Sequence, residues 1–271
     1  MPELPEVETT IRGLTRYLDG ERIMRVTLNR PDLRRPFPPD LVQVLTGARI
    51  IGLGRRAKYG LIHTDRDQTM VFHLGMSGKW RIDPEHDDRH DHLVLETAEH
   101  RFALNDPRRF GSVDLVASPA LHQWGALATM GPEPLGDELD SARLHHALQG
   151  RKQAIKLLLL DQKIIAGLGN IYVCEALYRA RINPQRPGGK VSRRALDRLI
   201  PSIRDVLEQS IRDGGSSLRD YARPDGELGY FATNFAVYDR ENEPCLRDDG
   251  GIITRIVQGG RSTWYCPVCQ K

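Results

Sequence analysis

Short apolar segments separated by turn residues constrain the fold of this chain more than any other feature of its sequence. Between about residues 22 and 117, Gly, Pro, Asp and Asn repeatedly interrupt runs rich in Val, Ile, Leu and Phe. This punctuation predicts a β-sandwich or a β-barrel. The expected strands span residues 22–28, 48–56, 59–64, 69–75, 92–97, 100–104 and 111–116. Before them, apolar residues at helical spacing predict a helix over residues 5–19, which ends at Gly20.

A Pro-rich passage at residues 130–139 indicates a domain boundary, and the pattern then becomes helical as far as about Arg212. Residues 253–258 and 262–266 regain β character on either side of a Gly-Gly pair, which predicts a hairpin. The length of 271 residues suits one large or two medium domains. We therefore expect an α+β chain with a β-rich domain at 1–130, a helical domain at 131–235 and a Cys-bearing hairpin at 236–271.

The net charge of +3 hides a segregated distribution. Residues 150–200 hold eleven Lys or Arg residues against three Asp or Glu, a local balance of +8. Such a concentration of positive charge indicates a region that binds a polyanion, and a solvated helical surface is the alternative. No apolar run approaches the roughly 20 residues that span a bilayer, and Glu3, Glu6 and Glu8 replace the basic and apolar stretches of a signal peptide. We therefore expect a cytoplasmic protein without membrane contacts.

Pro2 is the first candidate catalytic residue. Met before Pro is normally removed, which exposes a secondary amine at Pro2; if Met1 is retained, this nitrogen is an inert amide. An α-amine has a pKa of about 8, so a useful fraction is unprotonated at neutral pH. Its attack on a sugar C1′ gives a cationic iminium, which makes later C–O cleavage possible. Glu3 and Glu6 are close enough in sequence to act as acid or electrostatic partners. The alternative is that Pro2 simply starts a helix.

The cysteines are concentrated at the C-terminal end, which favours a metal site over disulfides in a cytoplasmic chain. Three of the four lie in the last 27 residues: Cys245, Cys266 and Cys269. Asp248 stands where a fourth cysteine would be expected, and no histidine follows His146. Asp248, Asp249 or water must therefore complete the tetrahedral shell of one zinc ion. The remaining Cys174 lies in an apolar helical stretch and is expected to be a small buried hydrophobe.

Several loops carry residues suited to binding DNA. The segment GLGNIY (167–172) places two glycines before a helix start inside the basic region, which favours phosphate binding, although the glycines are also compatible with a plain loop. The segments HLGMSG and NDPRRFG place Met76, Arg108 and Phe110 on glycine-bounded turns. Met and Phe are normally core residues, but beside arginine on such turns they can be wedges inserted between base pairs. The segment RRAKYG adds Lys58 in a basic turn.

Together these segments resemble the bacterial formamidopyrimidine-DNA glycosylase family, essentially from end to end. The motifs that carry the resemblance are PELPEVET, RRAKYG, HLGMSG, HDH, NDPRRFG, MGPEPLG, GLGNIY, GGSSLRDY, GYF and GGRSTWYCPVCQ. The related endonuclease VIII group shares the architecture but usually begins PEGPE and lacks the Met, Arg and Phe loop residues. The resemblance implies an N-terminal β-sandwich flanked by helices, followed by a helix–two-turn–helix domain with a zinc-finger-like β-hairpin.

The resemblance also implies a bifunctional enzyme of base excision repair. Such an enzyme excises oxidised purines, among them 8-oxoguanine and formamidopyrimidines, from double-stranded DNA and nicks the strand by β,δ-elimination. Pro2 would be the Schiff-base nucleophile and Glu3 the proton donor for base loss and sugar-ring opening. Lys58 would be the proton donor for β-elimination, and Arg261, at the hairpin tip, the donor for δ-elimination. The residues matching the family's DNA contacts are His90, Arg108, Lys152, Asn170, Met76 and Phe110. The last two, with Arg108, would fill the gap left by the everted base.

One departure from the family concerns the finger, which normally has four cysteines, whereas this chain offers three and Asp248. We expect one zinc per chain, and the alternative is a hairpin held by packing alone. We expect the hairpin to enter DNA because Arg261 is present. The Gly, Pro and Asp content of residues 216–230 predicts a mobile lid over the everted base. We expect a monomer. The alternative functions are an endonuclease VIII-like glycosylase for oxidised pyrimidines and a non-catalytic binder of damaged DNA.

Overall fold

The computed structural model describes residues 2–216 and 231–271, so the predicted lid lies almost wholly outside the described residues. The chain forms two compact units, Met1–Ala128 with Ile211–Ala232, and Thr129–Ser210 with Thr233–Lys271. The first unit is therefore discontinuous in sequence, and it includes a segment that the sequence assigns to the helical domain. The boundaries at residues 130 and 235 stay a prediction. Within the described residues, no helix is both long enough and apolar enough to cross a membrane.

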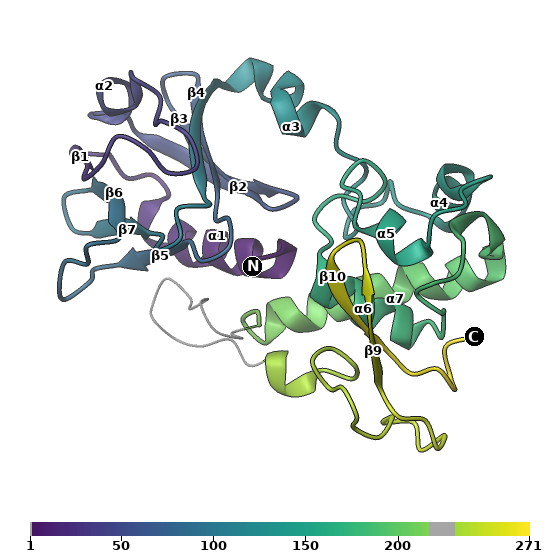
Figure 1. Cartoon of the computed structure of the whole chain (residues 1–271). Coiled ribbons are helices and arrows are strands. Elements are labelled where there is room, and N and C mark those ends of the chain that lie inside the picture. The colour runs from purple at the N-terminus through teal and green to yellow at the C-terminus, as the bar shows by residue number, and fades with distance from the viewer. Residues whose placement is uncertain (1, 217–230) are drawn as a thin grey trace. The chain divides into compact units, whose positions relative to one another are not determined.

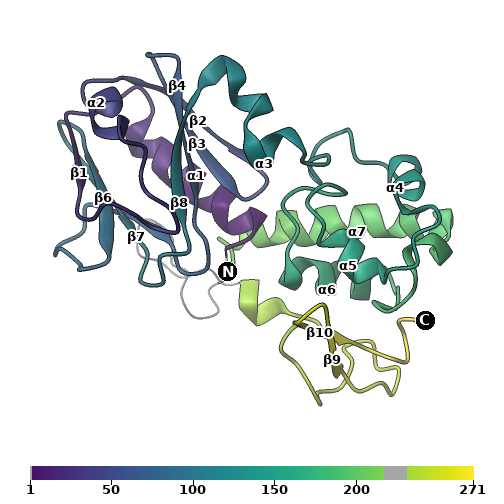
Figure 2. The same ribbon diagram turned by 45° about the horizontal axis from the view of Figure 1, so that its top comes forward.

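The first unit contains two antiparallel four-stranded sheets, with strand orders β1-β6-β7-β5 and β2-β3-β4-β8 (Figures 1 and 2). The strands are β1 (Arg25–Leu28), β2 (Ile50–Arg56), β3 (Tyr59–Thr64), β4 (Gln68–His73), β5 (Lys79–Ile82), β6 (Asp91–Glu96), β7 (Arg101–Asn105) and β8 (Ser112–Ala117). The helices of this unit are α1 (Leu4–Leu18), α2 (Leu41–Leu45), the 3-10 helix η1 (Ser118–Gln123) and α3 (Gly125–Ala128). The predicted first helix and the predicted strands are confirmed within a few residues, whereas β5 and α2 were not predicted.

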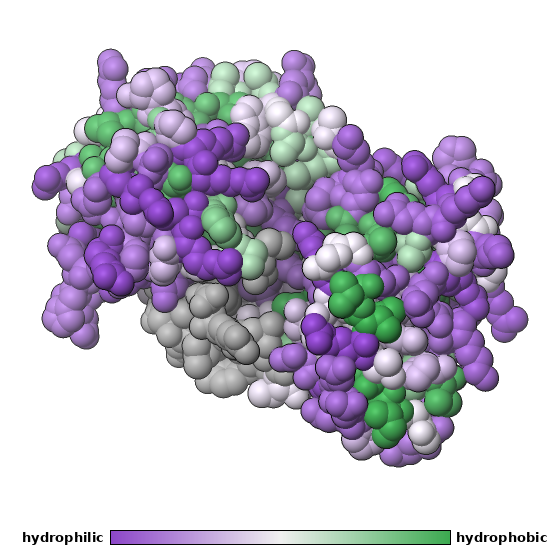
Figure 3. All heavy atoms as spheres, in the orientation of Figure 1, coloured by the Kyte–Doolittle hydropathy of each residue, from purple (hydrophilic) through white to green (hydrophobic). Residues whose placement is uncertain are grey.

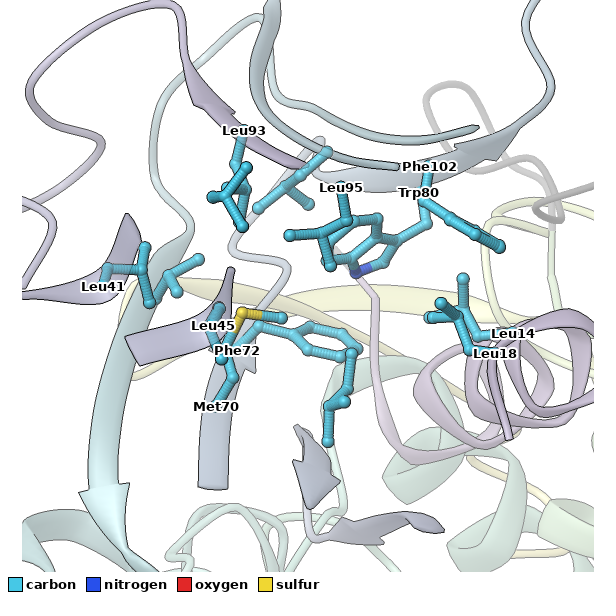
Figure 4. Close-up of a cluster of buried hydrophobic side chains, with 14 of the residues drawn as sticks. Leu14, Leu18, Leu41, Leu45, Met70, Phe72, Trp80, Leu93, Leu95 and Phe102 are labelled. Atoms are coloured by element: carbon cyan, nitrogen blue, oxygen red, sulfur yellow. The ribbon is translucent and has the colours of Figure 1, made fainter. Parts of the chain in front are cut away.

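The core of the first unit lies between the two sheets and is closed by helices, as expected for a β-sandwich (Figure 4). Phe72 of β4 and Trp80 of β5 meet edge to face across the sheets, with their ring centroids 5.5 Å apart. Leu14 of α1 and Leu45 of α2 are fully buried in the same cluster. Because burial of each such side chain contributes about 1.5–3 kcal/mol, this shared core holds sheets and helices together as one unit.

The second unit is helical and ends in a hairpin, as predicted. Its elements are α4 (Ser141–Leu148), α5 (Ile155–Leu159), α6 (Asn170–Arg179), the 3-10 helix η2 (Gly188–Lys190), α7 (Arg193–Arg212, whose last two residues fall in the first unit), the 3-10 helix η3 (Phe231–Asn234, which spans the boundary), β9 (Thr254–Gln258) and β10 (Arg261–Tyr265). Gly259 and Gly260 connect β9 to β10 with φ of 56° and 73°, the positive values that a two-residue hairpin turn requires.

The hairpin lies beside α6, and the two share a small core (Figures 1 and 2). Cys174 and Tyr178 of α6 pack there with Trp264 of β10 and with residues of the loop before β9. Cys174 is 1% exposed, which confirms the prediction that it is a buried hydrophobe. The C-terminal finger is thus attached to a helix of the basic region through ordinary apolar packing.

Hydrophilic residues dominate the face of the molecule seen in Figure 3. Hydrophobic residues do reach the surface in the finger, where four are at least 40% exposed: Leu246, Ile252, Val257 and Val268. Isolated exposed apolar residues are normal in folded proteins, so these four do not define a site by themselves.

Candidate functional site

The N-terminus of the first unit is a buried and tightly fixed structure. Pro2 is buried and Glu3, which is the N-cap of α1, is only 2% exposed. A reciprocal capping box holds this turn: the Glu3 side chain accepts from the backbone N–H of Glu6, and Glu6 Oε2 accepts from the backbone N–H of Glu3 at 2.8 Å. The backbone that carries Pro2 and Glu3 is therefore held in one conformation before any ligand arrives.

Glu6 has a structural role that sequence reasoning missed. Its Oε1 accepts from both the backbone N–H and the hydroxyl of Ser216, each at 2.9 Å. The same carboxylate thus joins the first turn of α1 to the segment that returns to the first unit after α7. Since both carboxylate oxygens of Glu6 accept these hydrogen bonds, Glu6 fits a positioning group better than a proton donor.

Lys58 lies in the tight turn between β2 and β3, next to Ala57 at φ of 53°, and it is 8% exposed. Arg55 attaches this turn to α1, because its side chain donates to Glu8 Oε2 and to the carbonyl of Ala57, both at 2.9 Å. Burial alone would raise the pKa of Glu8, but the hydrogen bonds from Arg55 and Arg12 lower it below its ordinary value. Glu8 is therefore ionised at neutral pH and pairs with Arg55.

The pKa of His73, at the end of β4, is influenced by the charge of Lys58. Burial is the main cause that lowers the pKa of His73 to about 4, and the charge of Lys58 adds to the effect. The neutral ring accepts from the backbone N–H of Gly75 through Nδ1 at 3.0 Å. His73 therefore serves as a fixed acceptor at the start of the HLGMSG loop and carries no charge at neutral pH.

The Asp106 carboxylate forms hydrogen bonds with both of the loops that carry Met76, Arg108 and Phe110. This carboxylate is 0% exposed, and it accepts from the Ser77 hydroxyl at 2.6 Å and from the backbone N–H of Gly111 at 2.8 Å. Ser77 in turn accepts from the backbone N–H of Arg108 at 3.2 Å. Ser77, next to Met76, and Gly111, next to Phe110, are thus fixed to one buried carboxylate, which the sequence did not single out.

The predicted DNA contacts of the first unit lie on this loop cluster. Arg108 and Phe110 are exposed, with the guanidinium carbon 5.0 Å from the ring centroid, and Met76 is half-buried. The carbonyl of His90 accepts from the backbone N–H of Asp106 at 3.0 Å, which places the half-buried His90 at the same cluster. The structure therefore brings these four candidates together on one side of the first unit, with Phe110 47% exposed and unsupported by a core.

The helix–two-turn–helix segment of the second unit places Asn170 at the first position of α6. The connection from α5 is held by Gln162, whose side chain accepts from the backbone N–H of Gly167 at 2.8 Å and donates to the carbonyl of Leu168 at 2.9 Å. Gly167 has φ of 83°, which requires glycine there. The exposed amides at the start of α6 suit a phosphate group.

Asn170 also contacts the hairpin. Its Nδ2 donates to the carbonyl of Ser262 at 2.9 Å, and Ser262 follows Arg261, the exposed first residue of β10. Asn170, a predicted DNA contact, thus lies beside Arg261, which the resemblance gives as a proton donor. Lys152 is exposed in the segment before α5 and belongs to the same unit, whereas Pro2, Glu3 and Lys58 belong to the first.

The predicted cysteine ligands form a cluster with an aspartate. One donor atom from each of Cys245, Asp249, Cys266 and Cys269 lies within 4.8 Å of the other three. Tetrahedral zinc with thiolates at about 2.3 Å needs ligand atoms roughly 3.8 Å apart. The Sγ atoms of Cys245 and Cys266 lie 3.4 and 3.7 Å from Oδ2 of Asp249, so these donors fit one zinc ion.

The prediction of Asp248 as the fourth ligand is wrong, because Asp249 occupies that place. Asp248 is exposed and turns the backbone at φ of 51°, so the next residue faces the cysteines. The backbone N–H of Gly251 orients Asp249 by donating to Oδ1 at 2.9 Å, which lowers the pKa of Asp249. A Cβ at position 251 would lie 2.4 Å from Sγ of Cys266, so only glycine fits beside the cluster.

Glu175 is a second buried carboxylate that sequence reasoning missed. It lies on α6, is 0% exposed, and accepts from the backbone N–H groups of Ala236, Val237 and Tyr238 at 2.9–3.1 Å. Burial raises the pKa of Glu175, and the three donors oppose that effect. An isolated acid in an apolar helix gives little signal in a sequence, since its partners lie about 60 positions away.

Comparison with known proteins agrees with this geometry over the whole chain. Three family models match in order: the formamidopyrimidine-DNA glycosylase N-terminal domain at residues 1–113, the formamidopyrimidine-DNA glycosylase H2TH domain at 130–222, and the zinc finger found in FPG and IleRS at 242–271. The formamidopyrimidine-DNA glycosylases of Erythrobacter litoralis and Novosphingobium aromaticivorans are 72% and 69% identical, with each chain covered completely.

Solved structures are also similar. The complex between Lactococcus lactis Fpg and DNA containing an abasic site has a TM-score of 0.92 at 34% identity, and both chains are covered completely. The wild-type L. lactis Fpg bound to DNA containing N7-benzyl-Fapy-dG gives the same TM-score, identity and coverage. The sandwich, the helix–two-turn–helix segment and the zinc-finger hairpin are thus all shared, and the chain belongs to the formamidopyrimidine-DNA glycosylase family.

Proposed function

We propose that this chain is a DNA glycosylase with AP lyase activity that excises oxidised purines from duplex DNA and nicks the strand by β,δ-elimination. The observation that carries the proposal is the fixed turn at the N-terminus, where Pro2 and Glu3 are buried and the capping box with Glu6 holds their backbone. A nucleophile and an acid on adjacent, immobilised residues suit attack at a single sugar carbon.

In this proposal, the secondary amine of Pro2, freed by removal of Met1, attacks C1′ of the damaged nucleoside. The bond from C1′ to the base breaks as Glu3 gives its proton to the leaving base. Glu3 then takes up the proton released from the Pro2 nitrogen and passes it to the sugar-ring oxygen as the ring opens. The product is an iminium cation at Pro2, which acts as the electron sink. Its electron demand makes the C2′ proton acidic, and loss of this proton to a base breaks the C3′–O bond with phosphate as the leaving group. Loss of the C4′ proton then breaks the C5′–O bond, again with phosphate leaving.

Lys58 and Arg261 are the proposed proton donors for these two eliminations, Lys58 for β and Arg261 for δ. Lys58 is held in a rigid turn and largely excluded from water, which suits a proton donor inside a closed site. Arg261 is exposed at the hairpin, where it can meet DNA.

Access to C1′ requires the base to leave the stack, which costs a few kcal/mol. Met76, Arg108 and Phe110 are proposed to fill the vacated space, and the exposed Phe110 ring is the wedge. His90, Lys152 and Asn170 are proposed to hold the backbone phosphates, so affinity should fall steeply with salt. Zinc at Cys245, Asp249, Cys266 and Cys269 contributes structure by fixing the hairpin.

The DNA substrate implies action in the bacterial cytoplasm at the nucleoid, and we expect the enzyme to act as a monomer. One active site on one chain is sufficient for the proposed chemistry. Sedimentation of the protein with a damaged duplex is expected to give a one-to-one complex, and a two-to-one complex would contradict the monomer.

Borohydride trapping on an 8-oxoguanine duplex tests the chemistry. Reduction of the iminium should give a covalent protein–DNA adduct with the native protein and much less with Pro2→Thr, which replaces the secondary amine by a primary one. Pro5→Ala, at the first turn of α1, is the matched control and should still give the adduct. A native N-terminus shown to be Pro2 together with no adduct would refute the enzyme and favour a non-catalytic binder. Faster excision of oxidised pyrimidines than of 8-oxoguanine would favour the endonuclease VIII-like alternative.

A further inference from the structure

Arg247 lies in the loop between two metal-binding residues, and its guanidinium reaches from this loop to the end of α6. Nη1 donates to the carbonyl of Tyr178 at 2.9 Å and to Sγ of Cys269 at 3.2 Å. Nη2 donates to the carbonyl of Arg179 at 3.2 Å. One side chain thus binds a metal-ligand sulfur and two backbone carbonyls at once.

The carbonyls of Tyr178 and Arg179 belong to the last turn of α6, where the regular i+4 partners of a helix run out. The Tyr178 carbonyl accepts from the backbone N–H of Arg181 at 3.0 Å and from Arg247 as well. A cation at this end is favoured by the helix dipole. The guanidinium also lies over the Tyr178 ring, 4.1 Å from its centroid, as in a cation–π pair. A planar guanidinium can make all of these contacts together, and a lysine ammonium cannot.

Tyr178 reaches the cluster as well. Its hydroxyl lies 3.3 Å from Sγ of Cys245. The last turn of α6 therefore contacts two of the three sulfur ligands, Cys245 through the Tyr178 hydroxyl and Cys269 through Arg247.

The charge of the cluster explains why a cation is needed there. Three thiolates and one carboxylate around a divalent cation leave a net charge of about −2, and both Cys245 and Cys266 are buried. A positive group within hydrogen-bond distance of Cys269 Sγ offsets one of these charges. Outer hydrogen bonds of this kind typically change metal affinity by roughly 10–100-fold.

We propose that Arg247 is a positioning residue of the metal centre, which orients the Cys269 sulfur by its hydrogen bond and fixes the cluster to the C-terminal end of α6. Asn170, at the other end of α6, is bound to β10 through the carbonyl of Ser262. The finger is therefore attached to both ends of one helix, and Arg247 supplies the attachment at the metal end.

The test compares zinc retention in Arg247→Met, Arg247→Lys and a matched control, Arg181→Met. Arg181 lines the same shallow hollow as Arg247 and Cys269, is exposed, and carries the same charge. Loss of zinc from the purified full-length protein to a chromogenic chelator gives the release rate. Titration of metal-free protein with Co²⁺ gives the affinity and the sulfur-to-cobalt absorption band. Neither measurement uses DNA, so failure here is distinct from failure of the proposed enzymatic function.

We expect Arg247→Met to weaken metal binding about tenfold or more and to speed zinc release correspondingly. Arg247→Lys should recover only a small part of the loss. Arg181→Met should stay within about twofold of the native protein, because it removes a nearby charge that, among the described residues, donates no hydrogen bond to the cluster. Equal effects of Arg247→Met and Arg181→Met would overturn the proposal, since general charge would then explain both. Full recovery by lysine would overturn the geometric part of it.

Discussion

Removal of the Asp106 carboxylate should disconnect the loops that carry Met76, Arg108 and Phe110. Asp106→Ala eliminates two charge-assisted hydrogen bonds, from the Ser77 hydroxyl and the Gly111 backbone N–H, in a fully buried setting. Hydrogen bonds to a charged group contribute about 1.5–3 kcal/mol each, so the free energy of unfolding should fall by about 3–6 kcal/mol. Asp106→Asn keeps one oxygen acceptor and the volume of the side chain, so it should cost only about 1–2 kcal/mol.

The assay pairs urea unfolding with binding of a duplex that carries a tetrahydrofuran abasic analogue, measured by fluorescence anisotropy. Asp87→Ala is the control, because Asp87 is an 80% exposed carboxylate paired with Arg101. Its effect on the free energy of unfolding should stay within about 0.5 kcal/mol. Asp87→Ala should be the most stable of the three variants and bind the damaged duplex most tightly. Asp106→Asn should be intermediate, and Asp106→Ala should be the least stable and the weakest binder. If Asp106→Ala binds the damaged duplex as tightly as Asp87→Ala does, the idea that this carboxylate positions the loops is refuted.

Three other outcomes can be checked directly. The pKa of His73 is lowered to about 4 from an ordinary value of 6.5, so acid favours the unfolded chain, which takes up the proton first. The unfolding free energy of the native protein, measured by urea titration, should fall by up to about 3 kcal/mol between pH 6.5 and 4. The unfolding free energy of His73→Gln should fall less over the same range. Parallel plots of unfolding free energy against pH for the two proteins would contradict this. Gly75→Ala should destabilise far more than Gly20→Ala in thermal unfolding. Both have positive φ, but only at Gly75 would a Cβ meet backbone atoms, at 2.3 Å, so equal losses would rule out the clash. Asp249→Ala should lower zinc content and weaken zinc affinity by more than about tenfold, with Asp248→Ala unchanged; the reverse result would restore Asp248 as the ligand.

Much of the first unit was predictable because its strands are bounded by turn residues and its first helix has apolar residues at helical spacing. Strand β5 was missed because KWRI alternates polar and apolar residues over only four positions, a run too short to stand out in the sequence. Helix α2 was also missed because it is short: its five residues give less than two turns of helical periodicity. These elements form because the shared core covers them.

Some residues of the candidate site could likewise be predicted from the sequence, and others could not. Pro2, Lys58 and Arg261 could be named from motifs, because family resemblance transfers residues position by position. Asp106 and Glu175 could not, since their roles depend on donors brought in by folding. The fourth metal ligand was misassigned because sequence spacing does not reveal that the backbone turns through positive φ one residue before the aspartate that faces the cysteines.

The hydrogen bonds between Glu6 and Ser216 join residues 210 positions apart within the first unit. Both sheets of that unit are complete by residue 117, so they can form early while the chain emerges from the ribosome. The turn that holds Pro2 and Glu3 gains its last two donors only after about four-fifths of the chain has been synthesised, because contacts between distant residues form late. The order of synthesis therefore delays completion of the hydrogen bonds around the proposed nucleophile, Pro2, until the helices of the second unit have been synthesised.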